Sequence, residues 1–587
     1  MISEEEENQW SSRKVYIMVL ICQFIGMSNV NSIPSNALLQ GTFGYTIFLT
    51  VFYVFMGIPI LYMESVVGQF TTRDCVDAWK IRPCFSYIGY MVVLWQAVIL
   101  IFNHIITSFL IHYFLISFES PVPFYTCGSW STRFCNSIVA NYTVNQDCIK
   151  YQNLFPYCDN LYKTFPEYQY WRQNLVRADY AGYKIAWKVC LASGLICFFV
   201  FIACFKRSKS LKWFVGGFAV YPMLALMVLF IGSMRQKGLV AKFEEALDLD
   251  FDNFRNKFRL SNLIHQVVFN LNIGTGVIFT LSSSTSFRTP CFSDIVIAVV
   301  FYALFTIMFV FTIAMMTCPY AFEYGVHTLA IIKTPMTLNF EKFPRLLYMY
   351  EDKTFYLIVM FSCNATLGIC TSVMFFFNII EVILKRCPKL RKYPGLTTFC
   401  AVVLMFIITI PFLSYNGVNI VAASFRLYIS LFSTFIAMLE CSVFLILYGI
   451  NKFAEDVHFM LGIKPKNCIK VSWILSTIFL TYAFVTEIYC QMVTASTYIY
   501  ATYGLLFIVS LQILVFIIRI LYAVGKKKGV KYLSLDPSWG PNNNLLQRSR
   551  AMFSAQAMTK EYIYRQYSLQ AGIMARQKNS NKRVCYR

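Results

Sequence analysis

The chain alternates between long apolar runs and short polar segments as far as residue 524. A helix needs about 20 apolar residues to cross roughly 30 Å of hydrocarbon, so each run of this length predicts a membrane span. The pattern therefore predicts an all-α membrane protein with twelve transmembrane helices, near residues 15–39, 43–69, 87–117, 186–205, 211–234, 262–283, 293–317, 355–386, 395–414, 418–448, 469–494 and 498–524.

Two of these runs are interrupted at mid-membrane by residues that weaken a helix. The first run contains Gly-Met-Ser-Asn at 26–29, with Pro34 soon after, and the sixth contains Asn-Leu-Asn-Ile-Gly-Thr-Gly at 270–276. Lipid offers no hydrogen-bond partner to backbone that leaves the helix, so such breaks persist only where protein encloses them. We expect the two breaks to line one shared binding site.

Composition agrees with the membrane assignment and limits the possible partners. The chain is 57% hydrophobic and 14% charged, whereas a soluble domain carries about a quarter charged residues. The net charge of +22 comes from Lys and Arg in short segments between the apolar runs, which the cytoplasmic preference of basic residues explains without a nucleic-acid partner. We predict a multi-pass plasma-membrane protein with a cytoplasmic N-terminal tail (1–14), a twelve-helix domain (15–524) and a basic cytoplasmic C-terminal tail (525–587) beside membrane lipid.

The segment 118–185 is predicted to be a large extracellular loop. It contains the glycosylation acceptor Asn141, followed by Tyr and Thr, which must face the lumen during synthesis. Its cysteines would lie in the same oxidising compartment; they are Cys127, Cys135, Cys148 and Cys158. The residues alone leave the pairing of these cysteines open.

Several motifs occur in a fixed order along the chain. They are Gly26–Val30 with Pro34, Gly57–Gln69, Cys127 with Trp130 and Cys135, Gln266 with Phe269, Leu367-Gly368-Ile369, and Tyr448–Phe453. In order and spacing they resemble the neurotransmitter:sodium symporter family. The resemblance implies a leucine-transporter-type fold, in which spans one to five repeat as six to ten with inverted topology, and a disulfide between Cys127 and Cys135. It also implies alternating-access transport of a small amine or amino acid, driven by sodium and often chloride.

The resemblance places a first sodium site beside the two breaks. The matching groups are the carbonyl of Phe24 and the side chains of Asn29 and Asn270, but the family's asparagine in span seven is Tyr302 here. A tyrosine hydroxyl lies too far from its backbone to replace an amide oxygen. We therefore expect this sodium site to be damaged.

The second sodium site and the chloride site are also implied by the resemblance. The second sodium site would use Cys22, Ile25, Leu367, Cys370 and Thr371. Cys370 stands where Asp or Thr is usual, and neutral sulfur is a poor sodium ligand, so this site is expected to be weakened. The chloride site would use Tyr62, Gln266, Asn270 and Thr306, for which ordinary interhelical hydrogen bonding is the alternative.

The solute site implied by the family lies between the breaks. Gly26 replaces the aspartate that holds a cationic amine in monoamine carriers, which favours an amino-acid-like or zwitterionic solute. Phe102 replaces a pocket tyrosine, so one hydroxyl donor is missing. The full predicted set is Gly26, Asn29, Phe102, Phe269, Asn272, Gly274 and Thr275. For Asn272, a helix-packing hydrogen bond is an equal alternative to solute contact.

The gates depart most from the family pattern. The outer arginine–aspartate pair is replaced by Ser32 and Phe425, so outer closure would depend on packing. At the inner pair the charges are exchanged, with Glu7 and Lys385 in place of arginine and aspartate. We hypothesise that these two residues form an inner latch; the alternative is that each is one of many solvated charges.

The sequence thus predicts a secondary transporter, symporter-like, with weakened or altered sodium coupling. A non-transporting relative acting as a receptor, scaffold or trafficking partner is the alternative. An enzyme is not expected, because no two histidines have close metal-ligand spacing; they are His104, His112, His265, His327 and His458. We expect no organic cofactor, with sodium and chloride as the candidate ions. The oligomeric state stays open.

Overall fold

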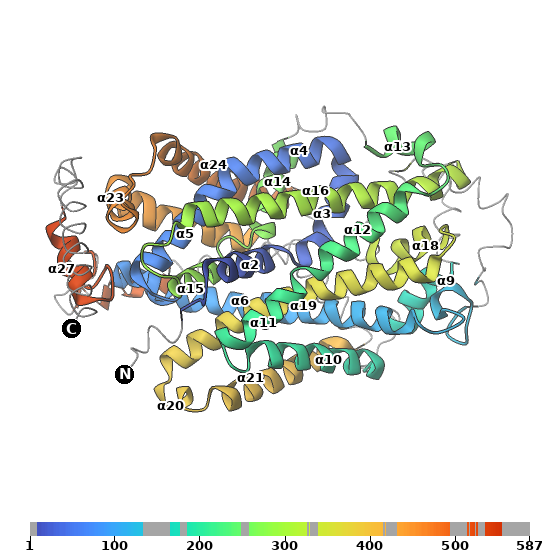
Figure 1. The fold of residues 1–587 in the computed structure, drawn as a ribbon, viewed down its shortest axis with the longest axis horizontal. Coiled ribbons are helices and arrows are strands. Elements are labelled where there is room, and N and C mark those ends of the chain that lie inside the picture. Colours follow the sequence, from blue (N-terminus) through green and yellow to red (C-terminus); the bar gives the residue numbers. More distant parts are fainter. Residues whose placement is uncertain are drawn as a thin grey trace, which may run out of the picture.

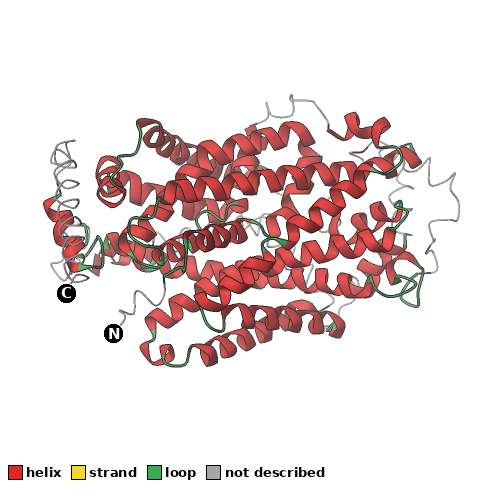
Figure 2. Ribbon diagram, in the orientation of Figure 1, coloured by secondary structure: helices red, strands yellow, loops and turns green. Residues whose placement is uncertain are grey.

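The computed structural model describes residues 9–132, 135, 165–176, 185–247, 257–325, 328, 338–414, 417, 431–493, 514–515, 517–519, 521–522, 524–525 and 534–553. These residues are almost entirely helical (Figure 2), and an isolated bridge between Ile185 and Ser414 is the only β-type pairing among them. Eight of their helices are long and apolar enough to cross a membrane, and two bent helix pairs pass the same test together. The predicted all-α membrane protein is confirmed within this part of the chain.

The first span consists of two helices separated by a short break. α2 (Arg13–Phe24) begins after Ser12, whose side chain caps it, and α3 (Met27–Gln40) follows Gly26. The two are bent by 42°. The break is shorter than the predicted 26–29, because the Asn29 side chain accepts a hydrogen bond from the Gly26 amide at 3.3 Å and so caps a new helix at once.

The predicted sixth span is interrupted over a longer segment. α14 (Lys257–Asn270) ends and α15 (Val277–Ser283) begins with residues 271–276 between them, as the sequence predicted. Asn272, Gly274 and Gly276 adopt left-handed backbone conformations, with φ of 52°, 71° and 74°. Glycine adopts these angles without steric cost and asparagine at little cost, which explains why the break lies at these residues.

Most of the other apolar helices have no sharp break, but the helix at 431–447 and α23 (Ile450–Leu461) form the second bent pair, with an angle of 86° between them. Span two runs through α4 (Thr42–Phe52), a π-helical turn η1 (Tyr53–Gly57) and α5 (Ile58–Thr71). The remaining long helices are α6 (Ile88–Ile116), α10 (Trp187–Cys204), α11 (Ser208–Phe218) with α12 (Tyr221–Met234), α16 (Cys291–Tyr324), α19 (Lys353–Arg386), α21 (Pro394–Thr409) with η9 (Ile410–Leu413), 431–447 ending in η10 (Ser442–Leu447), and α24 (Asn467–Val493).

Shorter elements cover the two ends of the bundle (Figure 1). We call the end with α9 and α18 the disulfide end and the end with α23 and α27 the tail end. The short elements are η2 (Asp77–Ile81), η3 (Pro83–Phe85), η4 (Pro123–Tyr125), α9 (Pro166–Gln169), η5 (Tyr170–Val176), α13 (Leu239–Leu247), η8 (Leu338–Lys342), α18 (Phe343–Tyr348), α20 (Pro388–Arg391), α23 (Ile450–Leu461) and α27 (Asn544–Met552).

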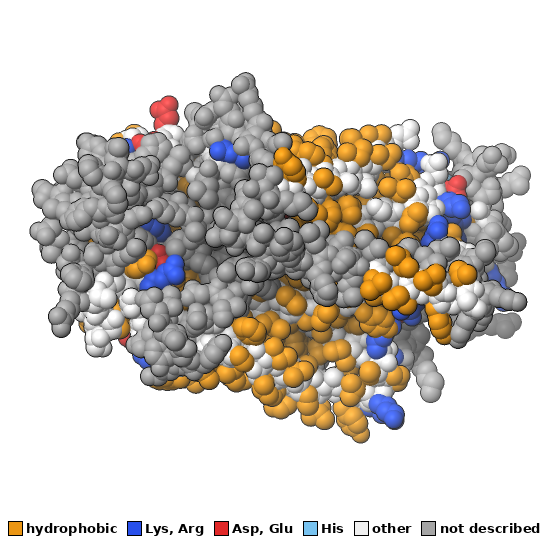
Figure 3. Space-filling model, turned by 180° about the vertical axis from the view of Figure 1, so that it is seen from behind, with side chains coloured by type: hydrophobic (Ala, Val, Ile, Leu, Met, Phe, Trp, Pro, Cys, Tyr) orange, Lys and Arg blue, Asp and Glu red, His pale blue; other side chains and the backbone are white. Residues whose placement is uncertain are grey.

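The surface is apolar around the middle of the bundle. Large side chains such as Leu94, Trp213 and Leu404 are exposed. The face in Figure 3 carries hydrophobic side chains across its centre, and its Lys and Arg side chains lie toward the ends. Such a band is costly in water and favourable in lipid, so it is the surface expected of a membrane-spanning bundle.

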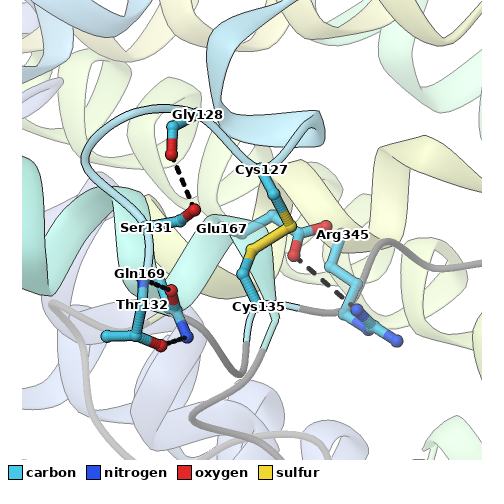
Figure 4. Close-up of a disulfide and its surroundings, with 8 residues drawn as sticks. All are labelled: Cys127, Gly128, Ser131, Thr132, Cys135, Glu167, Gln169 and Arg345. Carbon is cyan, nitrogen blue, oxygen red and sulfur yellow. Dashed lines mark hydrogen bonds and ion pairs between the residues drawn. A yellow bond between two sulfur atoms is a disulfide. The ribbon is translucent and has the colours of Figure 1, made fainter.

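The disulfide end is held together by covalent, aromatic and ionic contacts. Cys127 and Cys135 form a disulfide, the pairing that the family resemblance implied (Figure 4). Arg345 of α18 lies 3.7 Å from Glu167 of α9, and both side chains are almost fully buried. Burial raises the pKa of Glu167, although the nearby Arg345 acts to lower it. The Arg345 guanidinium also lies 3.6 Å from the centre of the Phe165 ring.

At the tail end, the segment after the last span folds back onto the bundle. The Asp536 amide donates to the Ile81 carbonyl at 2.9 Å, and Arg73 donates to the Ser538 carbonyl at 2.6 Å. The Trp539 ring lies 5.6 Å from the Arg73 guanidinium and 6.1 Å from the ring of Phe444. The tail therefore joins the connection between spans two and three to the end of span ten.

Replacing Trp539 by alanine should release this segment. Loss of the cation–π contact alone costs about 1 kcal/mol, which corresponds to about fivefold more frequent local opening. Hydrogen–deuterium exchange of peptides covering residues 534–553 should accelerate accordingly. Leu545→Ala is the control, since Leu545 is largely exposed. Equal exchange in both variants would show that Trp539 does not hold the segment.

Candidate functional site

The two broken spans face each other across a small cavity in the middle of the bundle. Its volume is about 20 Å³, which is enough for roughly one water molecule. The Asn272 side chain of the second break donates to the carbonyl of Gln23, just before the first break, at 2.7 Å. The cavity is lined by Gly26, Ser28, Ile99, Phe102, Asn103, Phe269, Asn272, Thr371 and Phe375.

Four of the predicted solute residues line this cavity: Gly26, Phe102, Phe269 and Asn272. The other three lie behind its wall. Asn29 donates to Thr306, the Gly274 amide donates to Glu64, and the Thr275 hydroxyl donates to the Asn272 carbonyl. These three residues shape the breaks instead of facing the space.

The break in span six is supported by polar side chains that the sequence reasoning missed. Glu64 of α5 accepts from the Gly274 amide at 3.0 Å, and Gln96 of α6 donates to the Thr275 carbonyl. Glu440 is also a fully buried acidic residue. An acidic residue inside a membrane span is itself a signal of function, so Glu64 and Glu440 could have been found from the sequence.

Asn103 of α6 presents the clearest hydrogen-bonding group to the cavity. Its amide nitrogen is used, since it donates to the Gly368 carbonyl at 2.8 Å and to Ser372 at 2.7 Å. Its carbonyl oxygen is buried and has no protein partner among the described residues. An unpaired buried acceptor costs about 1–3 kcal/mol, so a donor from a bound solute would be stabilised there.

The groups expected at the first sodium site and the chloride site bind one another. Asn270 donates to the Tyr53 hydroxyl at 2.7 Å and accepts from Gln266 at 2.5 Å. Asn29 donates to Thr306 at 3.3 Å. Tyr302 fills the adjoining space, with its ring 5.6 Å from that of Tyr53 and 6.1 Å from that of Phe24. We call this set, with Ser28 bonded to Tyr302, the polar network.

Tyr62 does not belong to the polar network. Its ring stacks on Trp473 at 5.9 Å and packs against Phe292 at 5.1 Å. Tyr53 contributes the hydroxyl instead. Nine residues separate the two tyrosines, which is about 13.5 Å along a helix, so both cannot reach the same place. The structure does not join Tyr62 to the other three residues predicted for the chloride site, and its assignment there stays a prediction.

Comparison with known proteins agrees with this arrangement. The model of the sodium:neurotransmitter symporter family matches residues 7–528. The chain belongs to this family. It is 22% identical over 495 residues to the sodium- and chloride-dependent glycine transporter 1 of Xenopus laevis, covering 80% of this chain and 77% of that protein. It is also 24% identical over 492 residues to the human sodium- and chloride-dependent neutral and basic amino acid transporter B(0+), covering 79% and 76%. The mouse protein of the same name is 25% identical over 491 residues, covering 79% and 76%.

The residues predicted for a second sodium site in this symporter-family chain lie where the first break approaches α19. A Cβ atom on Gly26 would overlap the Thr371 hydroxyl, so the two helices are in close contact. The Thr371 hydroxyl donates to the Leu367 carbonyl at 3.3 Å, and the Cys370 thiol donates to the Phe218 carbonyl at 3.6 Å. Two of the predicted ligand groups are thus engaged with the backbone, while Cys22 and Ile25 are fully buried.

The predicted gate residues of this family member are only partly described. Ser32 donates to the Ser28 carbonyl and accepts from Gln266 at 2.6 Å. Lys385 lies 3.9 Å from Asp74 and donates to the Thr72 carbonyl. The remaining predictions lie outside the described residues: Glu7, Phe425, Asn141, Cys148 and Cys158.

Further contacts hold the helices together at the tail end of the bundle. Trp10 donates to the Leu281 carbonyl at 2.9 Å, and Arg13 pairs with Asp294 at 2.6 Å. Nearby, burial opposes ionisation of Asp77, but the hydrogen bond from Lys80 and the charge of Arg386 outweigh it. The pKa of Asp77 is therefore below its ordinary value, which favours the ionised carboxylate beside Lys80 and Arg386.

Proposed function

We propose that this chain is a secondary transporter that moves a small amino-acid-like or zwitterionic solute by alternating access. The observation that supports this most directly is the hydrogen bond from Asn272 to the Gln23 carbonyl, which brings the two breaks together at one cavity. Unwound backbone inside a membrane is stable only around an enclosed polar site, and carriers of this architecture bind solute at such a place.

The cavity walls favour a zwitterion. Gly26 offers no side-chain charge to a cationic amine, while the unpaired oxygen of Asn103 can accept from an amino group. The N-terminus of α3 begins at the same wall, and the positive end of its helix dipole favours a carboxylate. The similarity to transporters named for glycine and for neutral and basic amino acids agrees with this proposal.

We further propose that sodium and chloride coupling is weak. In the polar network, Asn270, Gln266 and Thr306 are hydrogen-bonded to protein groups, so their side chains are satisfied without an ion. Binding an ion would require several of these hydrogen bonds to break, which offsets part of the binding free energy. At the predicted second sodium site, the sulfur of Cys370 is a poor ligand for sodium.

The finer architecture is part of the same proposal. It comprises twelve spans with a five-plus-five inverted repeat, the extracellular loop 118–185, and both tails in the cytoplasm of a plasma-membrane protein. Trp10 and Trp539 both lie at the tail end, which supports termini on one side. The latch between Glu7 and Lys385 would add to the ion pair that Lys385 makes with Asp74.

Uptake into proteoliposomes tests the function and its ion dependence. We expect labelled glycine, leucine or lysine to enter, and the initial rate to fall less than tenfold when choline and gluconate replace sodium and chloride. The wild-type protein is compared with the variant Gly26→Leu, in which the leucine side chain would overlap Thr371 and fill the cavity. It should abolish uptake.

The possible outcomes separate the candidate functions. Uptake that disappears without sodium would refute weak coupling but keep the carrier. No uptake of any solute in a broad panel would refute the carrier and favour the non-transporting alternative. The small cavity volume of about 20 Å³ is the observation that favours this second candidate, since a solute requires the walls to move apart.

A further inference from the structure

Two buried amide side chains lie one helical turn beyond the cavity, toward the tail end. Gln96 precedes the cavity residue Ile99 by three positions in α6, and Asn378 follows the cavity residue Phe375 by three positions in α19. Both helices are continuous here, so residues three apart share a face and lie about 4.5 Å apart along the axis. Since α6 begins and α19 ends toward the tail end, both amides lie on that side of the cavity (Figure 1).

These two amides begin a series of hydrogen bonds that reaches both breaks. Asn378 donates to the side-chain oxygen of Gln96, and Gln96 donates to the Thr275 carbonyl. The Thr275 hydroxyl donates to the Asn272 carbonyl at 2.6 Å, and the Asn272 side chain donates to the Gln23 carbonyl at 2.7 Å. The series therefore connects α19 and α6 with the second break and, through it, with the first.

The same amides contact the connection between spans two and three. The Cys75 sulfur accepts weak hydrogen bonds from Asn378 at 3.6 Å and from Gln96 at 3.9 Å. The Cys75 backbone amide donates to Thr280 of α15 at 3.3 Å. A Cβ atom on Gly276 would lie only 2.7 Å from the Cys75 Cβ. The end of the second break therefore packs tightly against this connection, and Cys75 is fully buried there.

Packing alone does not explain why these two positions carry amides. The side-chain oxygen of Asn378 is buried and has no protein partner in the part of the chain that the structure describes. Such an acceptor is costly, and an apolar side chain of similar size would avoid the cost. An amide has an advantage only when the contact opens, because it can then bind water, whereas separated apolar groups would be exposed to water.

We propose that Gln96 and Asn378 are positioning residues that hold an inner barrier between the cavity and the tail end. The inner barrier consists of these two residues with Cys75 and Thr275. Its hydrogen bonds keep the second break against α6 and α19 in the structure described here. Its role in transport rests on the proposed function, since a solute that leaves toward the tail end must cross this layer. Gln96 must then release the Thr275 carbonyl.

Labelling of Cys75 tests whether the two amides hold the inner barrier. The full-length protein in proteoliposomes is treated with N-ethylmaleimide, and modification of Cys75 is followed by peptide mass spectrometry. Gln96→Met and Asn378→Leu keep the approximate size of each side chain but remove its hydrogen bonds. We expect the buried thiol to be labelled at least about tenfold faster in both variants than in the wild type.

Thr107→Val is the matched control for these variants. Thr107 is also buried in α6, but it lies four residues beyond the cavity residue Asn103, toward the disulfide end. Its hydroxyl donates to the Asn103 carbonyl within the same helix. Labelling of Cys75 in Thr107→Val should therefore match the wild type. Cys204, a buried thiol that donates to the Val373 carbonyl, should stay slowly labelled in every variant.

Uptake separates positioning from a loss of folded protein. Per folded protein, the maximal uptake rate of Gln96→Met and Asn378→Leu should fall about tenfold while KM changes less than about threefold, since neither side chain lines the cavity. A measurement on the wild type avoids any variant that fails to fold. Adding whichever of glycine, leucine and lysine is taken up should accelerate labelling of Cys75, because the inner barrier opens in each transport cycle.

The outcomes distinguish the positioning role from the transport function. Unchanged labelling of Cys75 in both variants would overturn the proposal, as would equally faster labelling in Thr107→Val, which would indicate general loosening. Faster labelling with uptake equal to that of the wild type would overturn the role in transport, as would uptake by the wild type that leaves labelling of Cys75 unchanged. Faster labelling in both variants of a protein without any uptake would refute the proposed function and support the inner barrier.

Discussion

Replacing Gly274 by alanine should abolish uptake and sharply reduce the amount of folded protein. Gly274 has φ of +71°, where an alanine costs about 1–2 kcal/mol. An added Cβ would lie 2.6 Å from the Ser433 carbonyl oxygen and 2.9 Å from the Ala437 amide nitrogen. Both are backbone atoms that cannot rotate away, so overpacking adds about 1–3 kcal/mol. The expected destabilisation is therefore about 2–5 kcal/mol in total. It affects the break that forms part of the cavity wall.

Gly325 supplies a matched control for this experiment. It also has a left-handed conformation, with φ of +63°, but no atom lies within 4 Å of an added Cβ. Gly325→Ala should therefore cost only about 1–2 kcal/mol and leave uptake largely intact. Thermal unfolding of the detergent-solubilised proteins, with uptake measured in parallel, compares them. Similar melting temperatures and uptake in the two variants would contradict the steric argument.

Arg345→Met should destabilise the disulfide end by about 3–5 kcal/mol, because it leaves the buried carboxyl of Glu167 without its cation. The variant also loses the contact between the guanidinium and the Phe165 ring. A clear fall in melting temperature is the expected result. Lys80→Met is the control, since the partly exposed pair of Lys80 and Asp77 contributes only about 0.2–1 kcal/mol.

A double replacement distinguishes a lost ion pair from lost packing. Burial raises the pKa of Glu167 even beside Arg345, so desolvation of this carboxyl is a large cost in the folded protein. Arg345→Met combined with Glu167→Leu should therefore recover most of the lost stability. If the double variant is as unstable as Arg345→Met alone, packing of the arginine accounts for the effect instead.

Most of the spans could be predicted because membrane insertion depends on local composition. The run predicted at 87–117 became α6 (Ile88–Ile116), and that at 355–386 became α19 (Lys353–Arg386). The helix predicted at 293–317 continues to Tyr324 with Pro319 inside it, because neighbouring protein can compensate for the missing proline donor. The predicted span at 498–524 lies largely outside the described residues.

Pair contacts between spans were predicted less well. Tyr62 was assigned to the chloride site, but Tyr53 supplies the hydroxyl that Asn270 contacts. The cavity acceptor on Asn103 and the support that Glu64 gives to Gly274 were not predicted as parts of the site. Each depends on how one helix is rotated against another, and a single sequence carries little information about that rotation.

The sequence by itself determined that this protein is a helical membrane protein, where its main spans lie and where two of them break. These features follow from apolar length and from residues that cannot hold a helix, which act within a few turns of the chain. Only the tertiary structure decided which polar groups satisfy one another at the breaks, from the bond between Asn272 and Gln23 to the bond between Gly274 and Glu64. Lipid supplies no alternative partner for a buried polar group, so helix packing had to settle every such pairing.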